Sequence, residues 1–179
     1  MKLFLILTLI SIMASISGDH YIDFSQETPD SQWRIVNDGV MGGLSQGQFI
    51  LAEDHGIFQG TLSLENNGGF SWAKSFTRLE NLEGKTKVRL RVKGDGRKYA
   101  FTVETDRARS VAYYGASFTA PNDEWMEITL NAEDLRLNYF GRDMGQTLED
   151  LSPAVQIGII LADKKEGPFR LEVDYVDMM

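Results

Sequence analysis

A two-residue alternation of apolar and polar side chains runs through four segments of the sequence. The clearest is KVRLRVK at 87–93, where Val88, Leu90 and Val92 alternate with cations. The other three alternating segments are 99–105, 126–130 and 169–175. Successive side chains of an extended strand point to opposite faces, so this period predicts strands with one buried and one solvated face.

Turn-forming residues separate the alternating segments. Clusters of Gly, Asn, Asp and Pro lie at 66–69, 94–96, 121–123 and 166–168. Two short stretches, 132–137 and 147–151, are expected to form helical turns. Many strands at this spacing, with no long helical pattern between them, indicate antiparallel packing. We therefore predict an all-β sandwich.

The first residues have the order of a secretory signal peptide. Lys2 precedes an apolar stretch at 3–13, and small residues follow up to Gly18. This order predicts a signal peptide at 1–18 and a single β-sandwich domain at 19–179. Because the segment contains no arginine, it does not resemble a transit peptide, and we expect an exported bacterial protein, periplasmic or secreted. The alternative is an uncleaved segment that anchors the chain in a membrane.

Charge and cysteine content narrow the classes of partner. The formal net charge is −8 for the whole chain, and loss of Lys2 with the signal peptide would make it −9. An acidic domain is poorly suited to nucleic acid, and it is not expected to adsorb to anionic membranes or to insert stably after signal cleavage. Cysteine is absent, which excludes disulfides and thiolate metal ligands.

Catalytic and metal-binding patterns are scarce. The two histidines, His20 and His55, have no nucleophile motif nearby and no spacing typical of a metal pair. The glycine-rich stretches lack the Lys-Ser/Thr of a phosphate-binding loop. The sequence does not exclude a catalytic pair of carboxylates of the glycosidase type, because its 26 acidic residues allow many spatial pairings. We predict no catalytic residue, no metal site and no cofactor.

Four clusters combine polar side chains with glycine, at 37–45, 65–72, 94–97 and 140–143. Turn formation explains each cluster taken alone, whereas loops gathered at one end of a sandwich make natural ligand sites. The candidate binding residues are Asn37, Asp38, Asn66, Asn67, Trp72, Arg97 and Arg142. The candidate structural glycines are Gly39, Gly42, Gly43, Gly68 and Gly69.

The first two clusters allow more specific expectations. Asn37 and Asp38 are expected to cap neighbouring backbone N–H groups, with Met41 packed inward. If Gly43 has a positive φ, a Cβ at that position would strain the backbone. An exposed Trp72 beside polar loops would suit a polyol or a peptide backbone, by stacking and hydrogen bonding.

Several of these motifs occur together in one order. They are WRIVNDGVMGGLSQGQF, ENNGGFSW, GDGRKYAF, FGRD and IGIILADKKEGPFRLEVDYV. Over residues 21–177 they resemble the complex I intermediate-associated protein 30 family. The resemblance implies a galactose-binding-like jelly-roll β-sandwich. It also implies a non-enzymatic assembly factor or chaperone-like binder, best known from the building of mitochondrial respiratory complex I.

An export signal and this resemblance together predict an exported binding domain that helps to assemble or stabilise another protein. The alternative is a carbohydrate-binding module, favoured by the fold and by Trp72 beside polar loops. The expected partner is accordingly a protein, with a glycan as the alternative. An enzyme is the third and least supported class.

Overall fold

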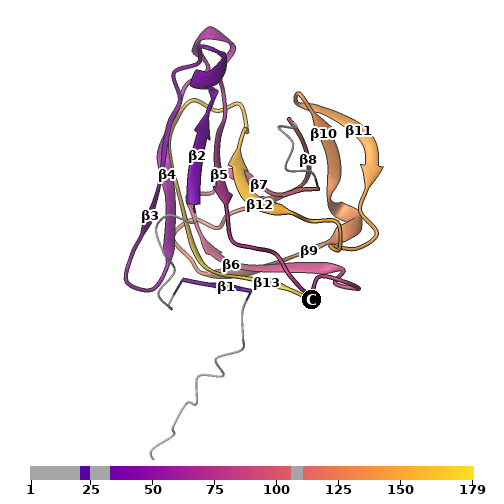
Figure 1. The fold of residues 1–179 in the computed structure, drawn as a ribbon. Helices are drawn as coiled ribbons and strands as arrows, with labels where there is room; N and C mark the ends of the chain where they lie inside the picture. Colours follow the sequence, from indigo (N-terminus) through magenta and orange to yellow (C-terminus); the bar gives the residue numbers. More distant parts are fainter. Residues whose placement is uncertain (1–20, 25–32, 106–110) are drawn as a thin grey trace, which may run out of the picture.

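The chain folds into two antiparallel β-sheets packed face to face (Figure 1). The computed structural model describes residues 21–24, 33–105 and 111–179. The expected signal peptide at 1–18 lies outside the described residues, and the domain boundary at residue 19 stays a prediction.

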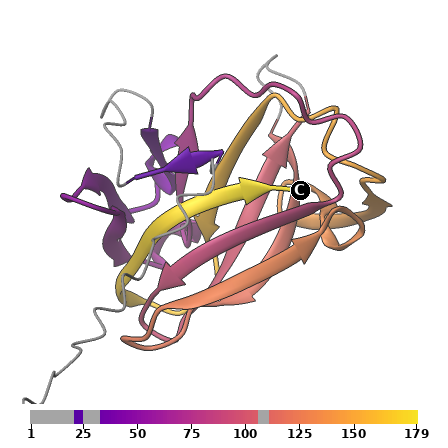
Figure 2. The ribbon, with the colours of Figure 1, turned by 90° about the horizontal axis from the view of Figure 1, so that it is seen from below.

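The first sheet has six strands in the order β3-β4-β13-β6-β9, with β1 paired to β13. Figure 2 shows β13, β6 and β9 side by side across this sheet. The strand bounds are β1 Ile22–Asp23, β3 Gln46–Leu51, β4 Gly56–Leu62, β6 Lys87–Lys93, β9 Met126–Asn131 and β13 Gly167–Met178.

The second sheet has seven strands in the order β11-β10-β8-β7-β12-β5-β2. It bends into a trough that opens away from the six-stranded sheet (Figure 1). We call the inside of this trough the concave face. The strand bounds are β2 Trp33–Asn37, β5 Ser71–Ser75, β7 Lys98–Glu104, β8 Ala112–Thr119, β10 Arg136–Tyr139, β11 Arg142–Thr147 and β12 Gln156–Leu161.

The core lies between the two sheets and is formed by the alternating residues. Val88, Leu90 and Val92 of β6 are completely buried, and Phe101 of β7 packs in the same cluster. Each of the four strands predicted from alternation is present, as β6, β7, β9 and β13. The prediction of an all-β sandwich is confirmed.

The helical elements of the described residues are three short 3-10 helices, η2 Asp38–Met41, η3 Glu65–Asn67 and η4 Ala132–Asp134. The helical turn expected at 132–137 is therefore partly correct, because η4 ends before β10 begins at Arg136. The turn expected at 147–151 is wrong. Thr147 pairs with Arg136 in the β10–β11 ladder, so its backbone belongs to a strand.

Charged side chains on the outward face of the six-stranded sheet form ion pairs with one another. Lys93 Nζ lies 2.8 Å from Glu172, and Arg170 Nε donates to the same carboxylate over 2.9 Å. Burial raises the pKa of Glu172, but the hydrogen bonds from Lys93 and Arg170 together lower it more, so the group stays ionised. These charges are therefore paired within the chain.

Within the described residues, no helix has the length and apolar character needed to cross a membrane.

Candidate binding site

Asp38 lies inside the loop that follows β2, with none of its surface exposed. Its Oδ1 accepts the N–H of Ser45 over 2.9 Å, and its Oδ2 accepts the Ser45 hydroxyl over 2.5 Å. The same Oδ2 accepts the N–H of Gly69 over 2.6 Å and that of Phe70 over 3.3 Å. One carboxylate thus ties the β2–β3 loop to the start of β5, and Asp38 caps backbone N–H groups as the sequence predicted.

The charge on Asp38 is stabilised by these donors. Burial raises the pKa of the carboxyl group, whereas the hydrogen bonds from Ser45, Gly69 and Phe70 lower it. The combined lowering is the larger effect, so the pKa lies below its ordinary value and Asp38 is ionised at neutral pH. A buried and fully engaged carboxylate stabilises the fold and is not open to a ligand.

Two glycines are needed because Asp38 is so close. A Cβ on Gly43 would overlap the Asp38 carboxyl group, and one on Gly68 would lie 2.6 Å from its Oδ2. Gly43 does not have a positive φ, so close approach is the reason for glycine there and backbone strain is not. Gly42 does have a positive φ of 90°, whereas a Cβ on Gly39 would meet nothing within 4 Å.

The asparagines of the same region connect two loops. Asn66 and Asn67 both adopt left-handed backbone conformations, with φ of 55° and 60°. Asn66 Nδ2 donates to the carbonyl of Gly42 over 3.2 Å. Asn37 makes no capping bond, contrary to expectation, and its Oδ1 accepts the hydroxyl of Ser71 over 2.7 Å. The binding roles of these asparagines stay predictions.

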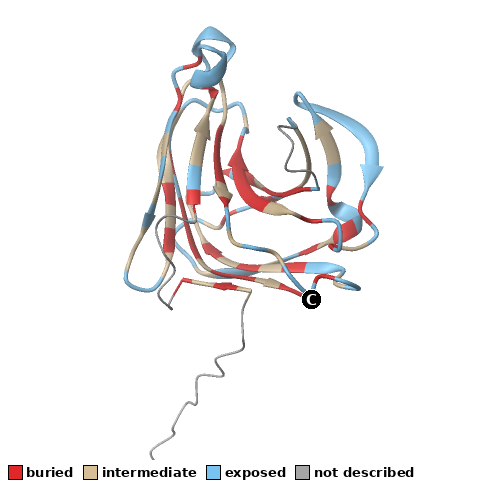
Figure 3. Ribbon diagram, viewed as in Figure 1, coloured by how far each residue is buried: buried red, intermediate tan, exposed pale blue. Residues whose placement is uncertain are grey.

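Apolar side chains project from the two loops that Asp38 joins. Val40 is 75% exposed, Met41 61%, Leu44 52% and Leu64 40%. We call these four residues the apolar tip; it belongs to the exposed end of the molecule at the top of Figure 3. The expectation that Met41 packs inward is wrong, because Asp38 occupies the interior of the loop.

Trp72 is buried on the concave face, so the expectation of an exposed indole is wrong. Its Nε1 donates to Thr102 Oγ1 over 3.0 Å, and its ring lies against Tyr113 with centroids 4.9 Å apart. Lys74 Nζ covers the ring at 3.7 Å. The indole crosses Gly158, where a Cβ would lie 2.8 Å from Nε1. The Trp72 side chain therefore packs against neighbouring strands of the concave face and is not open to a ligand.

Lys74 also forms an ion pair with Glu104 on the concave face, over 2.8 Å. The two side chains are 15% and 8% exposed. Burial raises the pKa of Glu104, and the hydrogen bond from Lys74 lowers it by less, so the net shift is upward. This ion pair covers the part of the concave face beside Trp72, so a ligand cannot reach the indole there.

Arg97 is buried and makes several hydrogen bonds to the loop between β12 and β13. It donates to both oxygens of Asp163, from Nε over 3.1 Å and from Nη2 over 2.7 Å. Its Nη1 donates to the carbonyls of Gly167 and Pro168 over 3.2 and 2.9 Å. Burial raises the pKa of Asp163, but the hydrogen bonds and charges of Arg97 and Lys165 together lower it more. Arg97 thereby fixes the shape of this loop.

Arg142 lies apart from the other candidate residues. It is exposed at the start of β11, opposite Tyr139 in the β10–β11 hairpin. The structure thus gathers the candidates of the first two clusters, apart from Trp72, at one end of the sandwich, and it places Arg97 and Arg142 elsewhere. The binding roles of these two arginines stay predictions as well.

A cavity of about 370 Å³ opens on the concave face. Strands β7, β8 and β12 and the loop after β12 form it, and its lining is residues 98–100, Tyr113, Ser117, Ile160 and residues 162–165. The sequence does not predict this cavity, because its lining comes from two separate motifs, GDGRKYAF and IGIILADKKEGPFRLEVDYV, and from Tyr113 and Ser117 of a third segment. Tyr113 and Ile160 place it directly beside buried Trp72.

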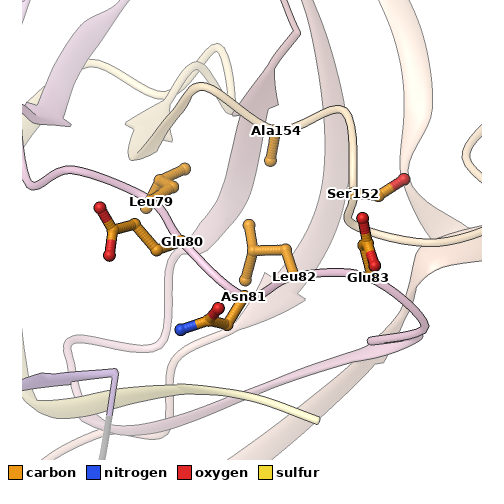
Figure 4. Close-up of a pocket in the computed structure, with 7 residues that line it drawn as sticks. All are labelled: Leu79, Glu80, Asn81, Leu82, Glu83, Ser152 and Ala154. Carbon is orange, nitrogen blue, oxygen red and sulfur yellow. The ribbon is translucent and has the colours of Figure 1, made fainter.

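A second cavity, of about 470 Å³, lies along the connection between β5 and β6. Figure 4 shows its lining, which is Leu79, Glu80, Asn81, Leu82, Glu83, Ser152 and Ala154. This lining contains no aromatic ring and no cation. It therefore offers neither ring stacking nor pairing with an anion, both of which the cavity on the concave face can provide. In the described part of the chain, no group of three or more His, Asp or Glu is arranged to hold a metal ion.

The two sheets and their connections define an all-β sandwich with the fold of carbohydrate-binding modules. Within that class, the chain belongs to the complex I intermediate-associated protein 30 family, whose family model matches residues 22–173. The family recognised from the sequence motifs is therefore confirmed.

Two curated relatives carry the same family name. Complex I intermediate-associated protein 30, mitochondrial, from Mus musculus is 23% identical in an alignment 179 residues long. The alignment covers 86% of this chain and 53% of the relative. A probable mitochondrial protein of that name from Caenorhabditis elegans is 26% identical over 122 residues, covering 65% and 35%. The chain spans about half the length, or less, of these relatives.

Solved structures with the same fold include carbohydrate-binding modules. A family 11 module of a cellulosomal cellulase from Clostridium thermocellum has a TM-score of 0.63 and 16% identity, with 89% of this chain and 92% of that chain covered. A family 11 module from the same organism, in complex with a mixed-linked tetrasaccharide, has a TM-score of 0.62 and 15% identity, with 88% and 93% covered. At this identity the likeness shows the fold alone.

Substitution of Asp38 tests its structural role. Asp38→Asn keeps the shape but replaces one acceptor oxygen with a donor, so buried N–H groups lose their partner. We expect the free energy of unfolding at pH 7 to fall by about 2 kcal/mol or more. Because the folded-state pKa is lowered, the wild-type advantage is full above the unfolded-state pKa and is lost as the pH falls through the folded-state value.

Chemical denaturation between neutral and acidic pH measures this difference. Exposed Glu149→Gln is the matched control and should leave unfolding nearly unchanged across the range. A difference between wild type and Asp38→Asn that grows toward low pH would contradict the assigned role of Asp38.

The neighbouring glycines offer a paired test. Gly43→Ala should lower the free energy of unfolding by about 1–3 kcal/mol, because its methyl group would displace a carboxylate held by several hydrogen bonds. Gly39→Ala has open space and should stay within about 0.5 kcal/mol of wild type. Thermal melts of the two variants provide the comparison, and equal losses of stability would show that the overlap with Asp38 is not the cause.

Proposed function

We propose that this chain is a non-enzymatic binding protein that helps to assemble or stabilise another protein, and that it binds this partner through the apolar tip. The observation that carries the proposal is the exposure of Val40, Met41, Leu44 and Leu64 at one end of the molecule. Apolar side chains gathered on a surface mark sites of protein interaction more often than scattered ones do.

The tip rests on a rigid base, which favours a binding role. Ser45 Oγ donates to Asp38 over 2.5 Å and accepts the N–H of Ser63 over 3.0 Å, so the two loops are joined below the tip. Asn66 joins them again at the carbonyl of Gly42. A surface that is already ordered loses less conformational entropy when a partner binds.

Charge around the tip favours a protein partner over a membrane surface. The sequence contains no Lys or Arg between Arg34 and Lys74. Asp38 is buried, and Glu65 is exposed beside Leu64. Anionic lipids attract basic segments, which the tip lacks. The partner surface that fits is an apolar groove with a neutral or basic rim.

Family membership supports a role in protein assembly, because the relatives are named for association with an intermediate of complex I. Those relatives are mitochondrial by name and about twice as long or longer, so the partner of this chain is a proposal of its own. The signal-like order of residues 1–18 favours a site of action outside the cytoplasm, in the periplasm or beyond.

Replacement of the two most exposed residues of the apolar tip should abolish partner capture without unfolding the protein. Val40→Ser combined with Met41→Ser removes two exposed side chains, so the free energy of unfolding should change by less than about 0.5 kcal/mol. The measurement is capture from envelope extract, followed by reciprocal purification of any protein that wild type retains and the variant does not.

The matched control removes two exposed apolar residues from another surface. Phe140→Ser combined with Met144→Ser alters the β10–β11 hairpin, where these side chains are 63% and 51% exposed. This control should still capture the partner. Loss of capture in the hairpin variant, with retention in the tip variant, would move the binding surface to the hairpin.

Export has its own test. If residues 1–18 are a signal peptide, protein recovered from the periplasm or medium should begin near Gly18 or Asp19. N-terminal sequencing of that protein is the measurement. An intact Met1 in the membrane fraction would support the anchored alternative instead.

A carbohydrate-binding module is the second candidate, favoured by the cavity on the concave face. The cavity combines the ring of Tyr113 and the hydroxyl of Ser117 with apolar Ala100 and Ile160. Family 11 carbohydrate-binding modules share the fold, and one was solved with a bound tetrasaccharide. A glycan that binds the chain in an array, without any captured protein, would reverse the order of the two candidates.

A further inference from the structure

The cavity on the concave face is cationic, although the chain as a whole has a formal charge of −8. Lys98, Lys164 and Lys165 line it. The remaining charged residue of the lining is Asp163, which is paired with Arg97 over 2.7 Å. Because the charges of Arg97 and Asp163 offset each other, the lining keeps a net positive charge from its three lysines, of which Lys165 also interacts with Asp163.

The floor of the cavity is apolar and carries hydroxyl groups at its sides. Ile160 lies opposite Ala100 in the β7–β12 ladder, and Ala100 lies opposite Ser117 in the β7–β8 ladder. Tyr113 adds an aromatic ring and a phenol, and burial raises the pKa of that phenol, so it remains a neutral donor. An apolar floor with hydroxyls beside it suits the faces and edges of a sugar ring.

The loop that carries two of the lysines is held in place by the protein itself. Lys164 has a left-handed φ of 60°, which is uncommon for a residue other than glycine. Arg97 holds this loop through both oxygens of Asp163 and through the carbonyls of Gly167 and Pro168. The backbone of Lys164 is therefore positioned before any ligand arrives.

We propose that this cavity binds an anionic saccharide, whose charged groups pair with Lys98, Lys164 and Lys165 while its ring lies on Ile160 and Ala100 beside Tyr113. The inference rests on the second candidate function and specifies its ligand class. A volume of about 370 Å³ accommodates one to a few rings, which is the scale of a ligand and not of a protein surface.

The charge requirement can be isolated with two probes that differ in charge. One is a tetramer of galacturonic acid, and the other is the same tetramer with its carboxyl groups methyl-esterified. Isothermal titration should show binding of the acid tetramer that weakens as salt is added, because salt screens exposed charges. The esterified tetramer should bind roughly tenfold more weakly or worse, the size expected when a few exposed charge contacts are lost.

Lysine variants localise the binding. Lys164→Gln combined with Lys165→Gln should weaken binding of the acid tetramer by roughly tenfold. Lys85→Gln combined with Lys87→Gln makes the same change in net charge away from the cavity lining and should leave the affinity unchanged. Thermal melts establish that both double variants are folded. Equal weakening in both would mean that net charge acts, and the cavity proposal would fail.

Two further probes, a sulfated tetramer and an acidic peptide, separate the remaining outcomes. A sulfated galactan tetramer tells whether sulfate replaces carboxylate, and binding of either anionic sugar supports the proposal. Equal binding of the esterified and acid tetramers overturns the charge requirement but leaves carbohydrate binding standing. A tetra-aspartate peptide that binds more tightly than every sugar overturns the ligand class. If no sugar binds at millimolar concentration, the inference and the second candidate function both fail, while the assembly role of the apolar tip is unaffected.

Discussion

The buried carboxylate of Asp38 is the interaction on which the loop end of the sandwich depends. It accepts hydrogen bonds from Ser45, Gly69 and Phe70, which lie on two loops far apart in the sequence. Burial of a charge is unfavourable unless donors surround it, and here they do. Because the carboxylate fills the interior of the loop, the apolar residues around it, Val40 and Met41 among them, have no interior space and face solvent.

Much of the fold could be predicted, because a strand with one buried and one solvated face alternates apolar and polar residues. Strand β6 is the clearest example, with Val88, Leu90 and Val92 buried in turn. Strand β12 shows no such clear alternation, since apolar residues are buried on both of its faces: Ile159 packs in the core, and Ile160 lies at the bottom of the cavity on the concave face. Strand β11 is exposed along its whole length and has no apolar period at all.

The candidate site was only partly predictable, because side-chain burial depends on partners distant in the sequence. Asn and Asp beside glycine marked the loops correctly, but composition cannot tell a carboxylate that faces a ligand from one enclosed by backbone donors. Trp72 is covered by Tyr113 and bonded to Thr102, which belong to other strands. The cavity itself is assembled from three strands and a loop, so no local pattern contains it.

The two proposed surfaces differ in chemistry but share one short segment. Gly69 and Phe70 donate to Asp38 beneath the apolar tip, and Ser71 donates to Asn37. The next residue, Trp72, already lies on the concave face opposite Ile160, which lines the cavity. Loss of the Asp38 carboxylate would therefore release donors that directly precede the indole supporting the cavity floor. The tip and the cavity are separate in what they can bind, yet β5 and the two residues before it contact elements of both.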